Sequence, residues 1–282
     1  MSSLPSTHAS EGNEWESALA SAGCLDLFRQ HHAEATAESV TRFLAFSEHN
    51  PSSIRQCLET ARFNARAVRT ALTVEMWETI NGAWLEIQDS KPHALPFIDI
   101  PRFLDWVKEV SLRFDGSGYR TMLRNDAFYF SRLGIYLERA DATARILDVK
   151  FHFLLPATSP VGGGVDYAQW SAILRAVSAA ASYHWVYRES LKPWLIADLL
   201  ILKEEMPRSL AACYANIITN LDHLAAAGGR QGAAQRRAHA LYRKLRSENI
   251  AQIFQSGLHE FINGFIADND GVNAAVVEQY LS

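Results

Sequence analysis

The sequence predicts an all-α fold, a bundle of antiparallel helices with short connections. Apolar residues recur three and four positions apart along most of the chain, which is the spacing of one helix face. Prolines stand at the beginning of several of these periods, and proline is favoured in the first turn of a helix. No convincing run of alternating polar and apolar residues predicts a strand.

The predicted elements follow in chain order. Residues 1–14 are polar and acidic, and we expect a disordered tail there. Asn50 can cap an amphipathic helix that Pro51 begins. The other predicted helices are a short one opened by Pro101, a long one from about Tyr119 to Leu154, one each starting at Pro193 and Pro207, one over residues 230–265, and a last short one over residues 273–281.

Length and composition bound the organisation of the chain. With 282 residues and 48% hydrophobic content, we expect one domain over residues 15–282, with halves at about 15–117 and 118–227 and C-terminal helices over 230–282. A formal net charge of −4 gives no reason to expect nucleic acid as a main partner. The three cysteines are few, odd in number and far apart, and no apolar run is long enough to span a membrane. We therefore expect a cytoplasmic protein without a membrane partner.

A faint internal repeat is visible at an offset of 155 residues (170 − 15). The matching residues at this offset are Trp15, Leu19 and Phe28 with Trp170, Leu174 and Tyr183. With one added residue, NPSSIRQC at 50–57 matches MPRSLAAC at 206–213. Chance similarity between helical patterns is the alternative, but ordered agreement of both segments favours duplication.

One predicted stretch of helix, residues 133–149, carries two charged faces. At about 100° per residue, one face holds three carboxylates and an arginine, namely Glu138, Asp141, Arg145 and Asp148. The residues nearly opposite are Arg132, Arg139, Thr143 and Lys150. One apolar strip beside the acidic face is Leu133, Leu137, Ala140, Ala144 and Leu147, and a second strip on the opposite flank is Ile135, Ala142, Ile146 and Val149. A surface helix normally has one polar side, so a charged face here must meet the protein interior or a partner, which makes it the candidate site.

The acidic face has two interpretations. It can bind a cation, a substrate amine or a cationic partner, and Glu138 is then the acid/base candidate if burial raises its pKa. In the other interpretation the carboxylates are neutralised inside the bundle, because an unpaired buried charge is costly. This charged seam would consist of Glu138, Asp141, Asp148 and Arg145 with Arg62, Arg66 and Arg69 of the earlier helix. A solvated face is the alternative for those earlier arginines.

Metal and cofactor signals are weak. The charged helix has no Glu-x-x-His pair of the di-iron kind, and the sequence has neither HExxH nor paired CxxC. We expect no metal site and no cofactor. The alternative is a hard divalent cation such as magnesium on the carboxylates.

Several of these segments resemble one family. The similar segments are LERADATARILDV at 137–149 with KFHFLLP after it, NPSSIRQCLETARFNARAVR at 50–69, TVEMWETIN at 73–81 and MPRSLAAC at 206–213. They resemble the bacterial alpha-E domain family. The resemblance implies an all-helical protein of undetermined activity, encoded beside or fused to circularly permuted ATP-grasp and transglutaminase-like proteins.

That setting implies an accessory or scaffold protein whose partner is an ATP-grasp ligase or a transglutaminase-like enzyme of peptide ligation or modification. The alternative is an enzyme acting on a peptide, amide or amine through Glu138, Asp141 and Asp148. Family members usually open with a first copy of the acidic-face helix, and this chain starts just before Trp15 without one. We therefore expect two diverged repeats, the first lacking its opening helix, with an apolar groove that favours a homo-oligomer.

Overall fold

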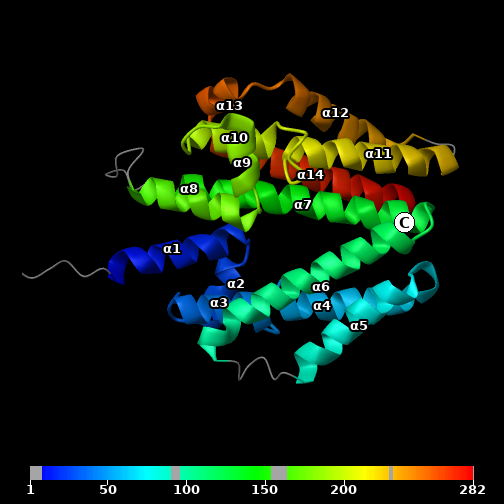
Figure 1. Ribbon diagram of the computed structural model, residues 1–282, viewed down its shortest axis with the longest axis horizontal. Helices are drawn as coiled ribbons and strands as arrows, with labels where there is room; N and C mark the ends of the chain where they lie inside the picture. The colour runs from blue at the N-terminus through cyan, green and yellow to red at the C-terminus, as the bar shows by residue number, and fades with distance from the viewer. Residues whose placement is uncertain (1–7, 90–95, 154–163, 229–230, 282) are drawn as a thin grey trace, which may run out of the picture. The chain divides into compact units, whose positions relative to one another are not determined.

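The protein is all-α, as predicted (Figure 1). The computed structural model describes residues 8–89, 96–153, 164–228 and 231–281, which form fourteen α-helices and two short 3₁₀ helices without a strand. For residues 8–14, 149–153, 164–166 and 227–228 only the backbone is described. The chain divides into two compact units, which we call unit 1 (Met1–Phe128) and unit 2 (Tyr129–Ser282).

Unit 1 begins with a helix inside the segment expected to be a tail, because α1 starts at His8. Its helices are α1 (His8–Ser21), α2 (Leu25–His31), α3 (Ala37–Phe46), α4 (Ile54–Ala67), α5 (Val74–Asp89) and α6 (Ile100–Thr121), with 3₁₀ turns at Arg69–Ala71 and Phe97–Asp99. Helix α5 packs against both α4 and α6. The sequence predicts a boundary between the repeat halves near residue 117, which lies inside α6. The two compact units instead separate after Phe128.

Unit 1 has small cores. One joins α1, α2 and α3 through five buried side chains, Leu19, Cys24, Phe28, Val40 and Phe43. A second joins the end of α3 to the start of α6 through Ala45, Phe46 and Ile100. Helix α5 buries one side, including Met76, Ile80 and Trp84.

Unit 2 has one large core to which each of its helices contributes. Its helices are α7 (Asp126–Phe153), whose first turn lies in unit 1, and α8 (Gly164–Ala176), α9 (Ala180–Tyr187), α10 (Pro193–Ile201), α11 (Leu210–Gly228), α12 (Ala233–Ser247), α13 (Ile250–Ser256) and α14 (Leu258–Tyr280). The predicted apolar strip of the charged helix is buried in this core, and its five members are Leu133, Leu137, Ala140, Ala144 and Leu147. This burial fixes which face of α7 points inward.

The two units share a helix order and a capping geometry. Helices α1 to α4 and α8 to α11 follow in the same order, and their first residues are separated by 155 or 156 positions (for α4 and α11, 210 − 54). Ser53 Oγ donates to the Ser47 carbonyl at 2.8 Å and accepts from Gln56 N–H at 3.3 Å. The equivalent Ser209 Oγ donates to the Lys203 carbonyl at 2.6 Å and accepts from Ala212 N–H at 2.9 Å. Equal hydrogen bonds at equal spacing support the internal duplication.

The cap of α4 is Ser53, so the prediction of an Asn50 cap was wrong. Asn50 instead accepts the N–H of Ser52 through its side chain at 3.0 Å, and the Ser53 N–H donates to its carbonyl at 2.9 Å. Residues 50–53 therefore form a turn before the helix, and Pro51 lies in this turn.

The helix predicted from Tyr119 to Leu154 is two helices. Residues up to Thr121 finish α6, Met122 is extended, and α7 begins at Asp126. The Arg124 guanidinium donates to the carbonyls of Tyr119 at 2.7 Å and Met122 at 3.3 Å. A side chain thus satisfies carbonyls that the end of α6 leaves unpaired, and apolar spacing carries no signal of such a cap.

The C-terminal segment also differs from the prediction. The span 230–265 contains α12, α13 and the start of α14, and the last helix is long. Asn249 lies between α12 and α13. Its side chain accepts the N–H of Ala251 at 2.8 Å and thereby caps α13. Gly257 joins α13 to α14 with φ +101°, a conformation that side chains other than glycine rarely adopt.

The charged face of α7 as the candidate functional site

Helix α7 is held in unit 2 by polar contacts at both edges of its buried strip. Thr143 Oγ1 is buried and donates to the Arg208 carbonyl, just before α11, at 2.9 Å. Asn269 Nδ2 on α14 donates to the Leu137 carbonyl at 3.3 Å. Figure 1 shows α7 and α14 running along each other within unit 2. These contacts set the height and rotation of the charged face.

Asp141 and Arg145 form an ion pair along α7. Arg145 Nε donates to Asp141 Oδ2 at 2.7 Å, and this hydrogen bond raises the pKa of Arg145. The second oxygen, Asp141 Oδ1, is buried and has no hydrogen-bond partner among the described residues. Arg145 also lies within electrostatic range of Asp148 and of Asp270 on α14, which further favours its charged form.

Asp148 has a partner that is distant in sequence. His259 Nδ1 on α14 lies 2.6 Å from Asp148 Oδ1, and Asn263 Nδ2 lies 2.8 Å from His259 Nε2. The simplest hydrogen arrangement has Nδ1–H donating to the carboxylate while Nε2 accepts from the amide. Both side chains are largely buried, so the pair also fixes α14 against α7.

Glu138 differs from the other carboxylates of the face. Its side chain keeps contact with solvent, yet desolvation by surrounding protein raises its pKa, and the negative charge of Asp141 raises it further. The positive charges of Arg208 and Arg139 act in the opposite direction. The net effect is a raised pKa, which makes Glu138 a candidate for proton exchange.

A buried thiol lies in the same electrostatic neighbourhood. Cys213 on α11 is fully buried, and desolvation raises the pKa of its thiol to about 12, while Arg139 and Arg208 lower it and Glu138 raises it. The thiol is therefore protonated at neutral pH and is a poor nucleophile. The cluster thus consists of a carboxyl with a raised pKa, two arginines and a protonated thiol.

Sequence reasoning found four carboxylate-face residues and Arg139 but missed three neighbours, which are Arg208, Cys213 and His259. The repeat match MPRSLAAC contains both Arg208 and Cys213, so that motif was a usable signal. Nothing in the sequence near His259 indicates a partner 111 residues earlier. Arg139 itself lies over the Tyr136 ring at 5.5 Å.

The arginines of the predicted seam lie on or next to α4 and have contacts within unit 1. Arg62 Nε donates to Asn81 Oδ1 at 2.9 Å, and Arg69 lies 5.5 Å from the Trp77 ring centroid. Arg66 is exposed. The carboxylates of α7 have their observed partners in unit 2, so a seam joining them to these arginines stays a prediction.

The described residues contain no group of three or more His, Cys, Asp or Glu side chains suited to a metal ion. A magnesium ion on the α7 carboxylates therefore remains a prediction without geometric support. None of the described helices combines the length and apolarity that crossing a membrane requires.

Comparison with known proteins places this helix in a family context. The family model Alpha-E, described as a predicted alpha-helical domain with a conserved ER motif, matches residues 2–281. Glu138 and Arg139 form the only Glu-Arg pair in the sequence, so the ER motif falls at the centre of the cluster on α7. No curated protein and no solved structure matches the chain. Because the match covers nearly the whole chain, this protein belongs to the Alpha-E family.

Proposed function

We propose that this chain is a helical accessory protein that docks or positions an ATP-grasp ligase or a transglutaminase-like enzyme in bacterial peptide ligation or modification. The observation that carries the proposal is a set of exposed large apolar side chains in unit 1. Phe63 on α4 is 72% exposed, Leu112 on α6 is 72% exposed, and Leu123 after α6 is 77% exposed. Exposed apolar side chains of this size offer contacts that a protein partner can cover.

The exposed side chains fit a docking role because unit 1 has limited cores of its own. Its clusters hold five and three buried apolar residues, whereas unit 2 has one continuous core. A partner covering α4 and α6 would supply apolar burial that unit 1 lacks. Burial of apolar area contributes about 25 cal/mol per Å², so covering even a few such side chains is favourable.

The charged face of α7 also supports an accessory role, because two of its carboxylates have structural partners inside unit 2. Asp141 pairs with Arg145 along α7 itself. Asp148 pairs with His259 and so holds α14 against α7.

A binding measurement with a matched control tests the proposal. We expect the chain to bind the ATP-grasp protein in isothermal titration calorimetry and to raise its rate of peptide ligation with ATP. Phe63→Glu should weaken binding at least about tenfold, as loss of a central apolar contact does. Trp185→Glu changes an equally exposed aromatic residue of unit 2, at 82% exposure, and should leave binding intact.

Two results would contradict the accessory role. One is peptide or amide turnover by the chain alone. The other is binding that both substitutions leave unchanged. Sedimentation equilibrium of the chain by itself tests whether the partner is a second copy of this chain. A homodimer that Phe63→Glu breaks would show that a second copy covers unit 1.

A second candidate function rests on Glu138. Its raised pKa suits a general acid or base acting on a peptide, amide or amine substrate. In that case Glu138→Gln should abolish turnover of such a substrate while leaving the fold unchanged by circular dichroism. An unchanged rate in this variant would remove the enzymatic alternative.

A further inference from the structure

Two helices, one in each unit, expose faces of opposite charge. Helix α5 carries four carboxylates and no basic side chain over its sixteen residues. Helix α12 carries five arginine or lysine side chains and no carboxylate over its fifteen residues. Concentrated charge of one sign on a protein surface attracts a partner surface of the opposite sign.

The acidic face of α5 points away from the helices that α5 packs against. Met76, Ile80 and Trp84 are buried, whereas the carboxylates are exposed. The four residues of this face are Glu75, Glu78, Glu86 and Asp89. At about 100° per residue they fall within one sector of about 80°. No hydrogen bond or ion pair to these carboxylates is found in the described part of the chain.

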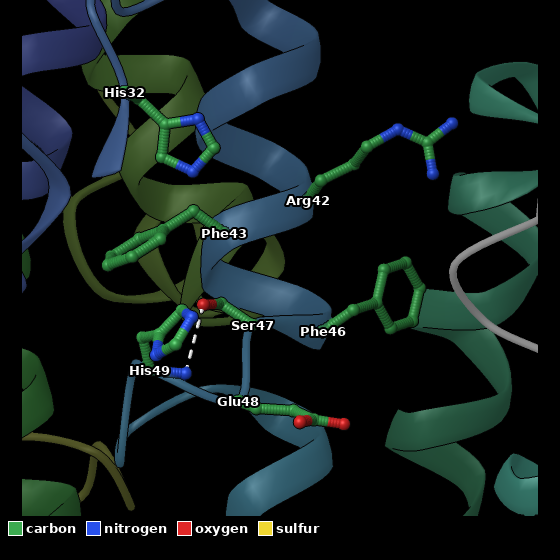
Figure 2. Close-up of a pocket in the computed structure, with 7 residues that line it drawn as sticks. All are labelled: His32, Arg42, Phe43, Phe46, Ser47, Glu48 and His49. Atoms are coloured by element: carbon green, nitrogen blue, oxygen red, sulfur yellow. Dashed lines mark hydrogen bonds between the residues drawn. The ribbon is translucent and has the colours of Figure 1, made fainter.

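Other exposed carboxylates of unit 1 have arginine partners. Three such pairs are Glu16–Arg29, Glu38–Arg42 and Glu48–Arg55. Figure 2 shows Glu48 just after α3, beside a hollow whose lining side chains point to both sides of that helix. That hollow offers no single binding surface, and its carboxylate is already paired. The acidic face of α5 is therefore the stronger candidate for an outside partner.

The basic face of α12 consists of four exposed side chains, namely Arg236, Arg237, Arg243 and Lys244. The opposite side of the helix is buried in the core of unit 2. Arg243 Nε donates to the His239 carbonyl of the same helix at 3.3 Å, and Lys244 Nζ lies 3.4 Å from Asp268 Oδ2 on α14. Arg236 and Arg237 have no hydrogen bond or ion pair to any described residue. Most of this positive charge is thus not balanced within unit 2.

The two faces match in spacing as well as in charge. Glu78 and Glu86 are eight residues apart on α5, which is about 12 Å along the helix. Arg236 and Arg243 are seven residues apart on α12, which is about 10.5 Å. Between these charges each face has small or apolar exposed residues, namely Gly82 and Leu85 on α5 and Ala240 on α12. Two helices laid side by side can therefore pair charges at both ends and pack closely in the middle.

We propose that the protein self-associates, with the acidic face of α5 in one copy bound to the basic face of α12 in a second copy. A second copy is the partner because each chain presents both complementary faces. In a two-fold dimer the contact forms twice. Single exposed ion pairs contribute little, so the association depends on several pairs acting together. This inference uses neither the exposed apolar side chains of α4 and α6 nor Glu138, so it fails independently of the proposed function.

Sedimentation equilibrium of the full chain measures the association and its electrostatic origin. We expect a concentration-dependent dimer at about 0.1 M salt. Raising the salt to about 1 M shortens the Debye length from about 10 Å to about 3 Å and should raise the dissociation constant at least about tenfold. A dimer that salt leaves unchanged would contradict pairing through these charges.

Charge reversal and mixing identify the two faces. Glu78→Lys with Glu86→Lys makes both faces of a chain basic, and Arg236→Glu with Arg243→Glu makes both acidic. Each double variant should be monomeric, because like charges then meet in both contacts. An equimolar mixture of the two should form a heterodimer, because opposite charges meet again in both contacts. If the two faces instead paired within one chain, mixing would not produce a heterodimer.

Controls separate this contact from a general effect of charge or folding. Glu109→Lys on α6 and Arg175→Glu on α8 reverse exposed charges away from both faces and should leave the dimer intact. Glu86→Gln and Arg243→Gln are milder variants that should weaken the dimer in the same direction. Circular dichroism should show native helical content for all of these variants, since the replaced side chains are exposed.

Three results would overturn the proposal. The first is a native chain that stays monomeric at both salt concentrations. A monomeric chain that binds duplex DNA and loses it on Arg236→Glu with Arg243→Glu would assign the basic face to nucleic acid instead. The second is a dimer that both double variants retain. The third is an equimolar mixture of the two variants that stays monomeric.

Discussion

Asn269 of α14 joins three helices of unit 2 through two buried hydrogen bonds. Its Oδ1 accepts from the Tyr214 hydroxyl of α11 at 2.8 Å, and its Nδ2 donates to the Leu137 carbonyl of α7 at 3.3 Å. Asn269 is 3% exposed and Tyr214 is fully buried, so water does not replace a lost partner. The charged face of α7 depends on this junction for its position.

Asn269→Ala should lower the free energy of unfolding of unit 2 by about 1–4 kcal/mol. The orphaned Tyr214 hydroxyl accounts for about 1–3 kcal/mol of this, because a buried donor without an acceptor carries its full desolvation penalty. The Leu137 carbonyl lies within α7 and loses a supplementary donor, which costs about 1 kcal/mol or less. The pKa of Tyr214 is raised by burial, so the hydroxyl cannot escape the penalty by ionising.

Urea denaturation followed by circular dichroism measures the loss. Tyr214→Phe keeps the ring against Phe265, whose centroid is 5.5 Å away, and removes only the hydroxyl. The double variant lacks the orphaned donor, so it should be less destabilised than the sum of the single variants by about 1–2 kcal/mol. Losses that add within about 0.5 kcal/mol would refute the coupling between α11 and α14.

Four further predictions concern substitutions at other positions. Gly257→Ala should lower the free energy of unfolding by more than about 1 kcal/mol, because φ is +101° and the added Cβ would lie 1.9 Å from Glu260 Oε2. Its control is Gly264→Ala in α14, where an added Cβ meets nothing within 4 Å. That variant should be more stable by up to about 1 kcal/mol in urea denaturation. Ser209→Ala should cost about 1–2 kcal/mol in urea denaturation through loss of the α11 cap. Glu138 has a folded-state pKa above its unfolded value, so its stabilising contribution is complete below the unfolded pKa and is lost as pH rises through the folded pKa. Glu138→Gln should thus be more stable than the native chain at pH 7, with the advantage shrinking toward pH 4; a constant difference would show that the carboxyl is not desolvated. Finally, the seam predicts a double-mutant coupling between Glu138→Gln and Arg66→Ala, and additive melting-temperature changes would show that the two residues do not meet.

The candidate site was predictable in part: contacts within α7 follow from the sequence, and contacts with other helices do not. The acidic face and the buried strip of α7 follow from a repeat of about 3.6 residues, so Glu138, Asp141 and Arg145 could be placed together without a structure. The Asp141–Arg145 pair lies within one helix turn and was within reach of the same reasoning. The partner of Asp148 could not be predicted in this way, because His259 lies on another helix 111 residues away.

The sequence by itself determined the helical class, the two charged faces of α7, the Glu-Arg pair and the matching proline segments before α4 and α11. Each depends on spacings of a few residues, which helix geometry converts directly into faces and caps. Tertiary structure alone decided the break between α6 and α7, which apolar strip of α7 is buried, the raised pKa of Glu138 and the pairing of Asp148 with His259. These depend on groups from distant segments brought within a few ångströms, where desolvation and Coulomb interactions act through space and not along the chain.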